Sequence, residues 1–281
     1  MSDLPPVWSA ILHRRAAGDI SREVALAQLI LNGGGPDLTA RLEAAGQSDM
    51  ARFTAAQGRR VRELADVVAR GIEPAAADTP DGQVAATAAL FDRLAGEAPD
   101  AAVAIYGLGD PDTMRAVTAE LVGVVDAWVG VAGRRVLDFG CGTGRVAAAL
   151  APQAREVLGI DLSAGMVAEA RRRHGAIGNL RFEAIADPPD AAFDLILAVD
   201  SFPFLVRAGG AVLADAFAGL ARALQPGGDM LVFNWSYRGD PALDVVDAVG
   251  MADAHGLRLR RAGETPFTIW DGFGFHFARA A

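Results

Sequence analysis

Residues 136–145 read Val-Leu-Asp-Phe-Gly-Cys-Gly-Thr-Gly-Arg, and this stretch decides the fold. Its first four residues predict the end of a short buried strand. Three glycines at alternate positions follow at once, before a helical stretch. Such a turn lets the backbone approach a ligand without interference from Cβ atoms. The spacing is not the Gly-x-Gly-x-x-Gly of dinucleotide sites, so on its own it also fits an ordinary strand-to-helix turn.

Beyond this turn, short apolar segments alternate with helical segments, a pattern typical of βαβ units and a mostly parallel sheet. The expected strands lie at 135–139, 157–161, 180–183, 193–199 and 230–234, and the expected helices at 145–150, 164–173 and 211–224. A further helix, 241–255, precedes two strands, 257–262 and 267–278, which a short turn joins. We therefore predict an α/β fold whose mostly parallel sheet ends in a C-terminal antiparallel strand.

The first hundred residues carry helical periodicity, and no alternating pattern appears before residue 130. We expect a helix that Asp19 or Ser21 caps, followed by helices near 37–45, 48–70 and 84–94, with a linker at 73–81. This pattern predicts two parts. An N-terminal α-helical region, 1–110, covers the substrate or mediates dimerisation, and a sheet domain, 111–281, includes its own lead-in helix.

Composition excludes several chemistries. The chain has 281 residues, a formal net charge of −9 and 52% hydrophobic residues, which is ample for a packed core. All 26 basic residues are arginine, so a Schiff-base lysine and a Gly-Lys-Ser/Thr phosphate loop are both excluded. Cys141 is the only cysteine, and no Asp, Glu or His set has metal-ligand spacing, so we expect neither a disulfide nor a metal. The acidic balance argues against a nucleic-acid partner.

The sequence also lacks the marks of a membrane or secreted protein. No basic segment followed by an apolar stretch opens the chain. Its most apolar region, 195–221, is interrupted by Asp200, Arg207 and Asp215, whereas a membrane-spanning helix needs about 20 apolar residues. We therefore expect a cytoplasmic protein with no membrane partner. The oligomeric state stays open, with a homodimer among the alternatives.

Two acidic residues accompany the glycine turn. Asp161 ends the next strand, about 20 residues on, where a carboxylate can accept hydrogen bonds from both hydroxyls of a ribose. Asp138 comes just before the glycines, and its charge suits a cationic amino-acid group rather than a phosphate. The pair points to a ligand with a ribose and a positive charge.

The stretch Asp138-Phe139-Gly140-Cys141-Gly142-Thr143-Gly144 resembles the first motif of class I S-adenosylmethionine-dependent methyltransferases. Three further stretches resemble later motifs of this family, in the family's order: Gly159-Ile160-Asp161-Leu162-Ser163-Ala164-Gly165-Met166, Phe193-Asp194-Leu195-Ile196 and Leu224-Gln225-Pro226-Gly227-Gly228. The resemblance covers roughly residues 134–281 and says little about the first hundred.

The resemblance implies a Rossmann-like sheet and S-adenosylmethionine as the cofactor, with S-adenosylhomocysteine as its product. It implies these cofactor-binding residues: Gly140, Cys141, Gly142 and Gly144 at the methionine part, Asp138 at the amino group, Asp161 at the ribose, and Leu162 and Met166 in the second motif. Many members also carry an acid after the third strand that meets the adenine amine. Here that position falls at Ala186, so Asp187 is the candidate, with a solvated turn aspartate as the alternative.

Ligands of parallel sheets bind outside the carboxyl ends of the strands, which selects the expected acceptor site. We expect a small-molecule substrate to contact Phe202, Phe204, Asn234, Trp235, Tyr237 and Trp270. The alternative is that these aromatic residues pack the helices against the sheet. Asp200, at the tip of the fourth strand, is the candidate for orienting or deprotonating the acceptor, with a turn-capping role as the alternative. Tyr106 is a second catalytic candidate because it precedes the sheet domain and could fold over the mouth of the site.

The sequence thus predicts a methyltransferase of a small organic acceptor, acting by in-line methyl transfer. Two alternatives stay open: an interaction protein that binds the cofactor or its product without catalysis, and a methyltransferase of a peptide or carrier-bound substrate.

Overall fold

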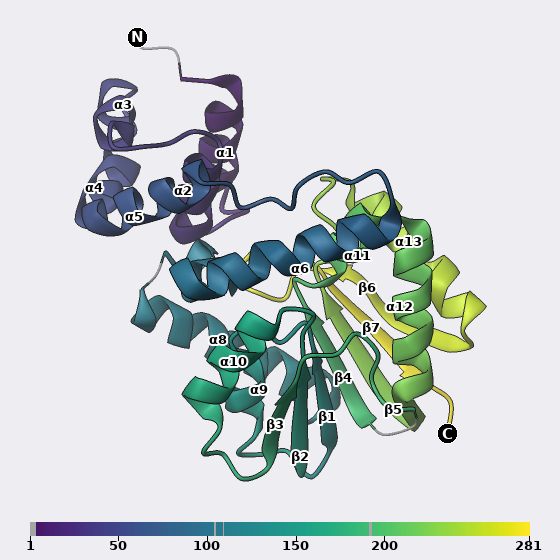
Figure 1. The fold of residues 1–281 in the computed structure, drawn as a ribbon. Helices are drawn as coiled ribbons and strands as arrows, with labels where there is room; N and C mark the ends of the chain where they lie inside the picture. Colours follow the sequence, from purple (N-terminus) through teal and green to yellow (C-terminus); the bar gives the residue numbers. More distant parts are fainter. Residues whose placement is uncertain (1–3, 104, 109, 191–192) are drawn as a thin grey trace. The chain divides into compact units, whose positions relative to one another are not determined.

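The computed structural model of the chain describes residues 4–103, 105–108, 110–190 and 193–281 (Figure 1). The chain forms two compact units, each assembled from separate segments. The helical unit comprises Met1–Ile72, Asp100–Val117 and Phe267–Asp271, and the sheet unit comprises Glu73–Pro99, Thr118–Pro266 and Gly272–Ala281. These two units do not coincide with the domains 1–110 and 111–281 that the sequence predicts. The substrate-covering or dimerisation role of the N-terminal region stays a prediction.

Within the described residues, one sheet of seven strands runs in the order β3-β2-β1-β4-β5-β7-β6. The strands are β1 (Arg135–Phe139), β2 (Glu156–Ile160), β3 (Leu180–Glu183), β4 (Phe193–Val199), β5 (Leu224–Phe233), β6 (Leu257–Glu264) and β7 (Gly274–Arg279). Strands β1 to β5 pair in parallel, whereas β7 is antiparallel to both β5 and β6. The predicted α/β, Rossmann-like sheet with a C-terminal antiparallel strand is confirmed.

The helices of the sheet unit are α6 (Pro80–Glu97), α9 (Arg145–Leu150), α10 (Ala164–His174), α11 (Phe202–Ala208), α12 (Gly210–Ala223) and α13 (Pro241–Ala254). Those of the helical unit are α1 (Pro6–Ala17), α2 (Arg22–Leu31), α3 (Leu38–Ala44), α4 (Ser48–Ala56), α5 (Gly58–Ala69), α7 (Pro99–Val103) and the 3₁₀ turn η1 (Ile105–Gly107). Helix α8 (Pro111–Val129) belongs to the helical unit up to Val117 and to the sheet unit from Thr118.

Several predicted boundaries are wrong. The single helix expected over 48–70 is interrupted at Gln57, which separates α4 from α5. Helix α6 starts earlier than expected, because Pro80 takes a first-turn position and the Thr79 side chain accepts the N–H of Gly82. Strand β7 starts at Gly274 rather than at residue 267, so the link from β6 is a longer loop than the predicted turn.

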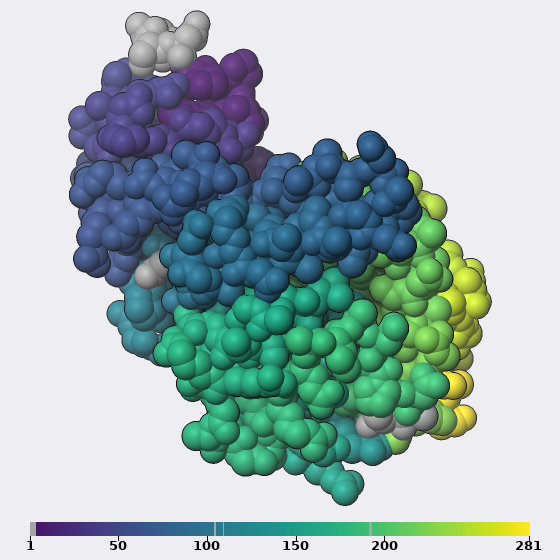
Figure 2. Space-filling model, in the orientation of Figure 1, coloured from purple at the N-terminus to yellow at the C-terminus, as the bar shows by residue number. Residues whose placement is uncertain are grey.

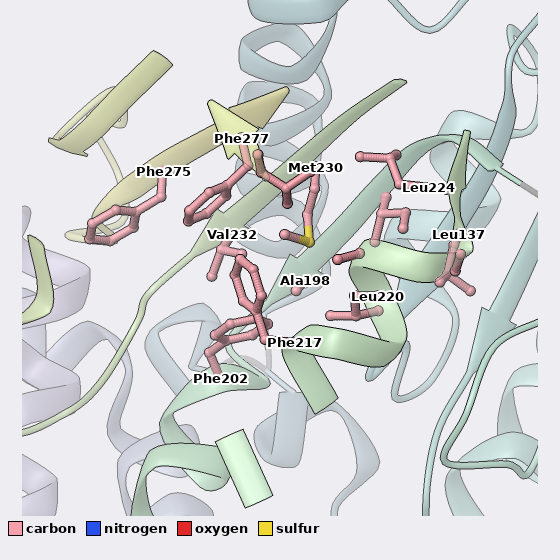
Figure 3. Packing of buried hydrophobic residues seen from close by; sticks show 14 of the residues in the cluster. Leu137, Ala198, Phe202, Phe217, Leu220, Leu224, Met230, Val232, Phe275 and Phe277 are labelled. Carbon is pink, nitrogen blue, oxygen red and sulfur yellow. The ribbon is translucent and has the colours of Figure 1, made fainter. Parts of the chain in front are cut away.

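The core of the sheet unit fixes the strands whose ends form the site. Phe217 of α12 meets Phe277 of β7 edge to face, with ring centroids 5.3 Å apart (Figure 3). Leu137 of β1, Ala198 of β4 and Val232 of β5 are fully buried in the same cluster. Burial of apolar surface contributes about 25 cal/mol per Å² to the free energy of folding. The cluster therefore stabilises the packing of β1, β4 and β5, whose ends form the site.

Candidate active site

The glycine turn after β1 is shaped by three left-handed residues. Gly140, Gly142 and Gly144 have φ values of 72°, 52° and 76°. A Cβ at Gly140 would lie 2.6 Å from the Cβ of Ser201, and one at Gly144 would lie 2.5 Å from the Cζ of Phe182. Both the left-handed backbone and the close neighbours therefore require glycine, as the sequence indicated.

Asp161, directly after β2, ties the glycine turn to the next turn of the chain. One carboxylate oxygen accepts the N–H of Gly142 at 2.9 Å, and the other accepts the N–H of Ser163 at 2.9 Å. A carboxylate can accept about four hydrogen bonds, so with the backbone N–H of Leu162 also donating to it, the group keeps capacity for a ligand hydroxyl. Burial raises the pKa of Asp161 and the charge of Asp92 adds to the rise, whereas hydrogen bonds from the backbone N–H groups of Ser163, Gly142 and Leu162 counteract it. The predicted ribose acceptor is thus held between both motifs.

Asp138 is almost completely buried beneath the glycine turn. Its carboxylate accepts the N–H of Ala147 in α9 at 3.0 Å. Burial raises its pKa to about 7, although the Ala147 hydrogen bond and the charge of Arg145 act in the opposite direction. A buried carboxyl group of this kind becomes ionised when a cation is placed beside it.

Cys141 lies inside the same turn and is buried. Burial raises the pKa of its thiol, and the nearby Asp138 and Asp161 carboxylates raise it further. A thiol in this environment stays protonated at neutral pH, which fits packing and not nucleophilic attack.

The other predicted cofactor residues occupy different settings. Leu162, next to Asp161, leaves 41% of its surface exposed, whereas Met166 is fully buried in the first turn of α10. The hydroxyl of Ser163 caps this helix by accepting the N–H of Met166 at 3.0 Å. Asp187 is exposed, and its carboxylate lies beside Gly219 of α12. The cofactor contacts of these residues stay predictions.

Two residues at the carboxyl ends of neighbouring strands have strained backbones. Asp200 follows β4 with φ 56°, and Asn234 follows β5 with φ 64°. The left-handed region is uncommon for residues other than glycine, and strain of this kind gathers at functional sites. The side-chain amide of Asn234 donates to the Asp200 carboxylate at 2.7 Å, and the Tyr237 hydroxyl donates to the same oxygen at 2.8 Å.

Asn234 is itself fixed by the start of the last strand. Its backbone N–H donates to the Phe273 carbonyl at 2.8 Å, and its side-chain oxygen accepts the Phe273 N–H at 3.0 Å. The strain at both strand ends is therefore maintained by a continuous hydrogen-bond network, which presents the Asp200 carboxylate at the edge where ligands of parallel sheets bind.

The predicted acceptor residues of the sheet unit fall into two groups. Phe204 and Tyr237 lie near Asp200, where their rings meet edge to face at 6.2 Å. Phe202 and Trp235 are fully buried in the core, with ring centroids 5.1 Å apart. The structure thus joins Phe204, Asn234 and Tyr237 to Asp200 and places Phe202 and Trp235 in packing positions.

Tyr106 and Trp270 belong to the helical unit. Their rings stack at 5.6 Å with an interplanar angle of 25°. This pairing joins η1 to the loop between β6 and β7 inside that unit, and the catalytic and substrate roles of the two residues stay predictions.

Sequence reasoning missed Ser201, which follows Asp200. Its hydroxyl is buried and has no hydrogen-bond partner among the described residues. The oxygen lies 3.3 Å from the position that a Cβ of Gly140 would take, so it faces the glycine turn. A buried hydroxyl without a partner is costly, and a polar group of a bound ligand would satisfy it. The glycine cradle, the buried Asp138, the half-buried Asp161 and this hydroxyl could hold an amino-acid group linked to a ribose.

No cluster of three His, Cys, Asp or Glu residues suited to a metal is found in the described ranges. In the same part of the chain, none of the helices combines the length and apolar character needed to cross a bilayer.

Part of the chain is similar to known methyltransferases. Residues 136–228 match the family model described as a methyltransferase domain. The demethylmenaquinone methyltransferase of Clavibacter sepedonicus is 33% identical over 160 residues, which cover 55% of this chain and 59% of that protein. A ubiquinone biosynthesis O-methyltransferase of Methylococcus capsulatus is 31% identical over 129 residues, 42% of this chain and 52% of that protein. The chain thus spans just over half the length of these two relatives.

Among solved structures, the magnesium protoporphyrin IX methyltransferase of Synechocystis PCC 6803, determined with bound S-adenosylmethionine, shares 21% identity and a TM-score of 0.50. The superposed region covers 73% of this chain and 99% of that one. At this identity the likeness shows the fold. The chain is therefore similar to methyltransferase domains over residues 136–228, and its sheet has the fold of these proteins.

Proposed function

We propose that this protein transfers the methyl group of S-adenosylmethionine to a small organic acceptor. The observation that carries the proposal is Asp161, which joins the glycine turn to the turn before α10 through hydrogen bonds to Gly142 and Ser163. This arrangement leaves hydrogen-bonding capacity for ribose hydroxyls beside a backbone cradle that only glycine fits.

We assign Asp161, Asp138 and Ser201 to different parts of the cofactor. Asp161 would accept the ribose hydroxyls, and the ionised Asp138 would attract the cofactor's ammonium group. The Ser201 hydroxyl would gain the hydrogen-bond partner that it lacks in the protein. When bound, the cofactor supplies a methyl group on an electron-poor sulfonium, so the protein mainly positions the reactants and excludes water.

On the acceptor side, Asp200 would accept a hydrogen bond from the N–H or O–H group that attacks the methyl, and would receive its proton where one must leave. Asn234 and Tyr237 hold the carboxylate for this task. The rings of Phe204 and Tyr237 offer an apolar surface to an organic acceptor. Small organic acceptors also agree with the names of the relatives, which refer to demethylmenaquinone and to ubiquinone biosynthesis.

A labelling experiment tests this function. The protein is incubated with methyl-labelled S-adenosylmethionine and a deproteinised metabolite extract. We expect label in the small-molecule fraction, and its loss in Asp161→Ala. Transfer of label only in a parallel incubation with peptides or carrier proteins would contradict the small acceptor, and binding without any transfer would contradict catalysis.

A further inference from the structure

Helix α6 lies outside the segment that matches the methyltransferase family, yet it packs on the elements that form the candidate site. It contacts both α10, which starts at the cofactor turn, and α11, which starts beside Asp200. Figures 1 and 2 show α6 (dark blue) lying across these helices of the sheet unit. Side chains on the face of α6 that contacts α10 and α11 can therefore influence the geometry of the site.

Asp92 of α6 makes the most specific of these contacts. One oxygen of its carboxylate accepts the hydroxyl of Ser163 at 2.6 Å and the backbone N–H of Gly165 at 2.8 Å. Both donors lie at the start of α10, where exposed N–H groups and the helix dipole favour a negative charge. Asp92 thus supplies an anionic cap to α10 from a different helix.

The turn that Asp92 holds is the one that holds Asp161. The N–H of Ser163 donates to Asp161, and the Ser163 hydroxyl accepts the N–H of Met166 while it donates to Asp92. Ser163 therefore stands between Asp92 and Asp161, with no other residue in the chain of hydrogen bonds. A shift of this turn would displace the carboxylate that faces the ribose.

Close packing supports the same contact. A Cβ at Gly165 would lie 3.1 Å from the Asp92 carboxylate and 3.2 Å from the Asp92 Cα, so the backbones of α6 and the turn approach closely. The preceding residue, Phe91, packs edge to face on Phe204 at 5.1 Å. Neighbouring residues of α6 thus engage the cofactor side and the acceptor side.

We propose that Asp92 is a positioning residue of the cofactor site, which acts through Ser163 and Gly165 to hold Asp161 against the ribose hydroxyls. This inference rests on the proposed use of S-adenosylmethionine. It assigns to α6 a role in cofactor affinity that differs from simple packing, because its effect is directed at one part of the ligand.

The test compares the binding of S-adenosylhomocysteine with that of its 2′-deoxy analogue by calorimetry. Wild type should prefer the natural ligand by about tenfold, because a carboxylate that loses its hydroxyl partner forfeits a charged hydrogen bond. In Asp92→Ala, S-adenosylhomocysteine should bind about tenfold more weakly, and the preference should fall to about twofold, since Asp161 is no longer held.

Two further variants separate positioning from packing. Asp92→Asn keeps an oxygen that accepts both hydrogen bonds, so it should retain affinity within about threefold and most of the preference. Gly165→Ala leaves Asp92 intact but adds a Cβ 3.1 Å from its carboxylate, so the contact must shift by a few tenths of an ångström, and the preference should fall by less than in Asp92→Ala. Asp81→Ala, an exposed residue of the same helix, is the matched control and should resemble wild type.

The outcomes are distinct. An Asp92→Ala protein that is folded by its thermal transition and keeps the wild-type preference overturns the inference, whether or not its overall affinity falls. Wild type that binds neither ligand overturns the proposed function, and this inference with it. A reduced preference in Asp92→Ala that Asp92→Asn restores supports the assignment.

Discussion

At the residue scale, the candidate site contains three aspartates that the fold places in different environments. Asp138 is buried beneath the glycine turn, Asp161 bridges two turns, and Asp200 lies in a strained strand end. The sequence singled out all three as candidates, because each lies at or beside the carboxyl end of an apolar strand. It did not predict Asp92 or Ser201, since neither lies in a pattern that distinguishes it from any exposed or turn residue.

Asp138 should make the stability of the ligand-free protein depend on pH. Its pKa is raised to about 7 in the folded state by burial, whereas an unfolded chain has a value near about 3.9. Between these values the folded state binds the proton more tightly, so stability falls as pH rises from about 4 to 7 and then levels off. The difference in urea unfolding between wild type and Asp138→Asn should change by about 4 kcal/mol over this range.

Cofactor binding should show the opposite trend. An ammonium group favours the ionised Asp138, so affinity for S-adenosylhomocysteine should increase as pH rises through 7 and binding should release a proton below that pH. Asp138→Asn should lack this dependence. A flat affinity profile in wild type between pH 5.5 and 8, whose ends are about 1 to 1.5 units from the folded pKa, would contradict the predicted ammonium contact.

Asn234 allows backbone strain and side-chain function to be separated. Asn234→Ala removes the hydrogen bond to Asp200 and keeps the left-handed backbone, so it should lower both stability and turnover. Asn234→Gly relieves the strain and should be about 1 kcal/mol more stable than the alanine variant, yet its turnover should remain about tenfold below wild type because Asp200 is not held. Wild-type turnover in Asn234→Gly would show that the strain, and not the amide, matters.

At the element scale, the strands and the turns at their ends were predictable because each strand is a compact apolar run. The boundaries of the helices were harder to predict from the sequence. In the 48–70 segment, Gly58 is a local signal for the interruption at Gln57, but a single glycine is also tolerated inside a helix, so it does not decide between one helix and two. Residues 267–271 look like strand because they carry aromatic side chains, but they pack in the helical unit instead, where Phe267 and Trp270 meet at 4.8 Å. Tertiary contacts decide such segments, and one sequence does not reveal them.

The glycine turn can be tested as an element with a matched pair of substitutions. Gly144 and Gly130 both have left-handed backbones, with φ of 76° and 71°. An added Cβ meets Phe182 at Gly144, whereas nothing lies within 4 Å of it at Gly130. Gly130→Ala should therefore cost only the backbone strain, about 1 kcal/mol, and Gly144→Ala about 3 kcal/mol or more. Equal losses in urea unfolding would refute the close-packed turn.

At the scale of the whole molecule, the two compact units interleave along the chain. Residues 73–99 join the sheet unit although they precede the methyltransferase motifs, and 267–271 join the helical unit although they lie between the last two strands. A domain boundary drawn from composition cannot show which unit these two segments join. Their placement depends on long-range contacts such as Asp92 with Ser163 and Tyr106 with Trp270. The family motifs, which are local, indicated the fold correctly.

The use of S-adenosylmethionine is tested most directly by a calorimetric titration of the protein with S-adenosylhomocysteine. We expect one site per chain, and a loss of affinity of about tenfold or more in Asp161→Ala, since the ribose hydroxyls lose a charged acceptor. Asp81→Ala should bind as wild type does. Absence of binding by the wild-type protein, or unchanged binding by Asp161→Ala, would contradict the account.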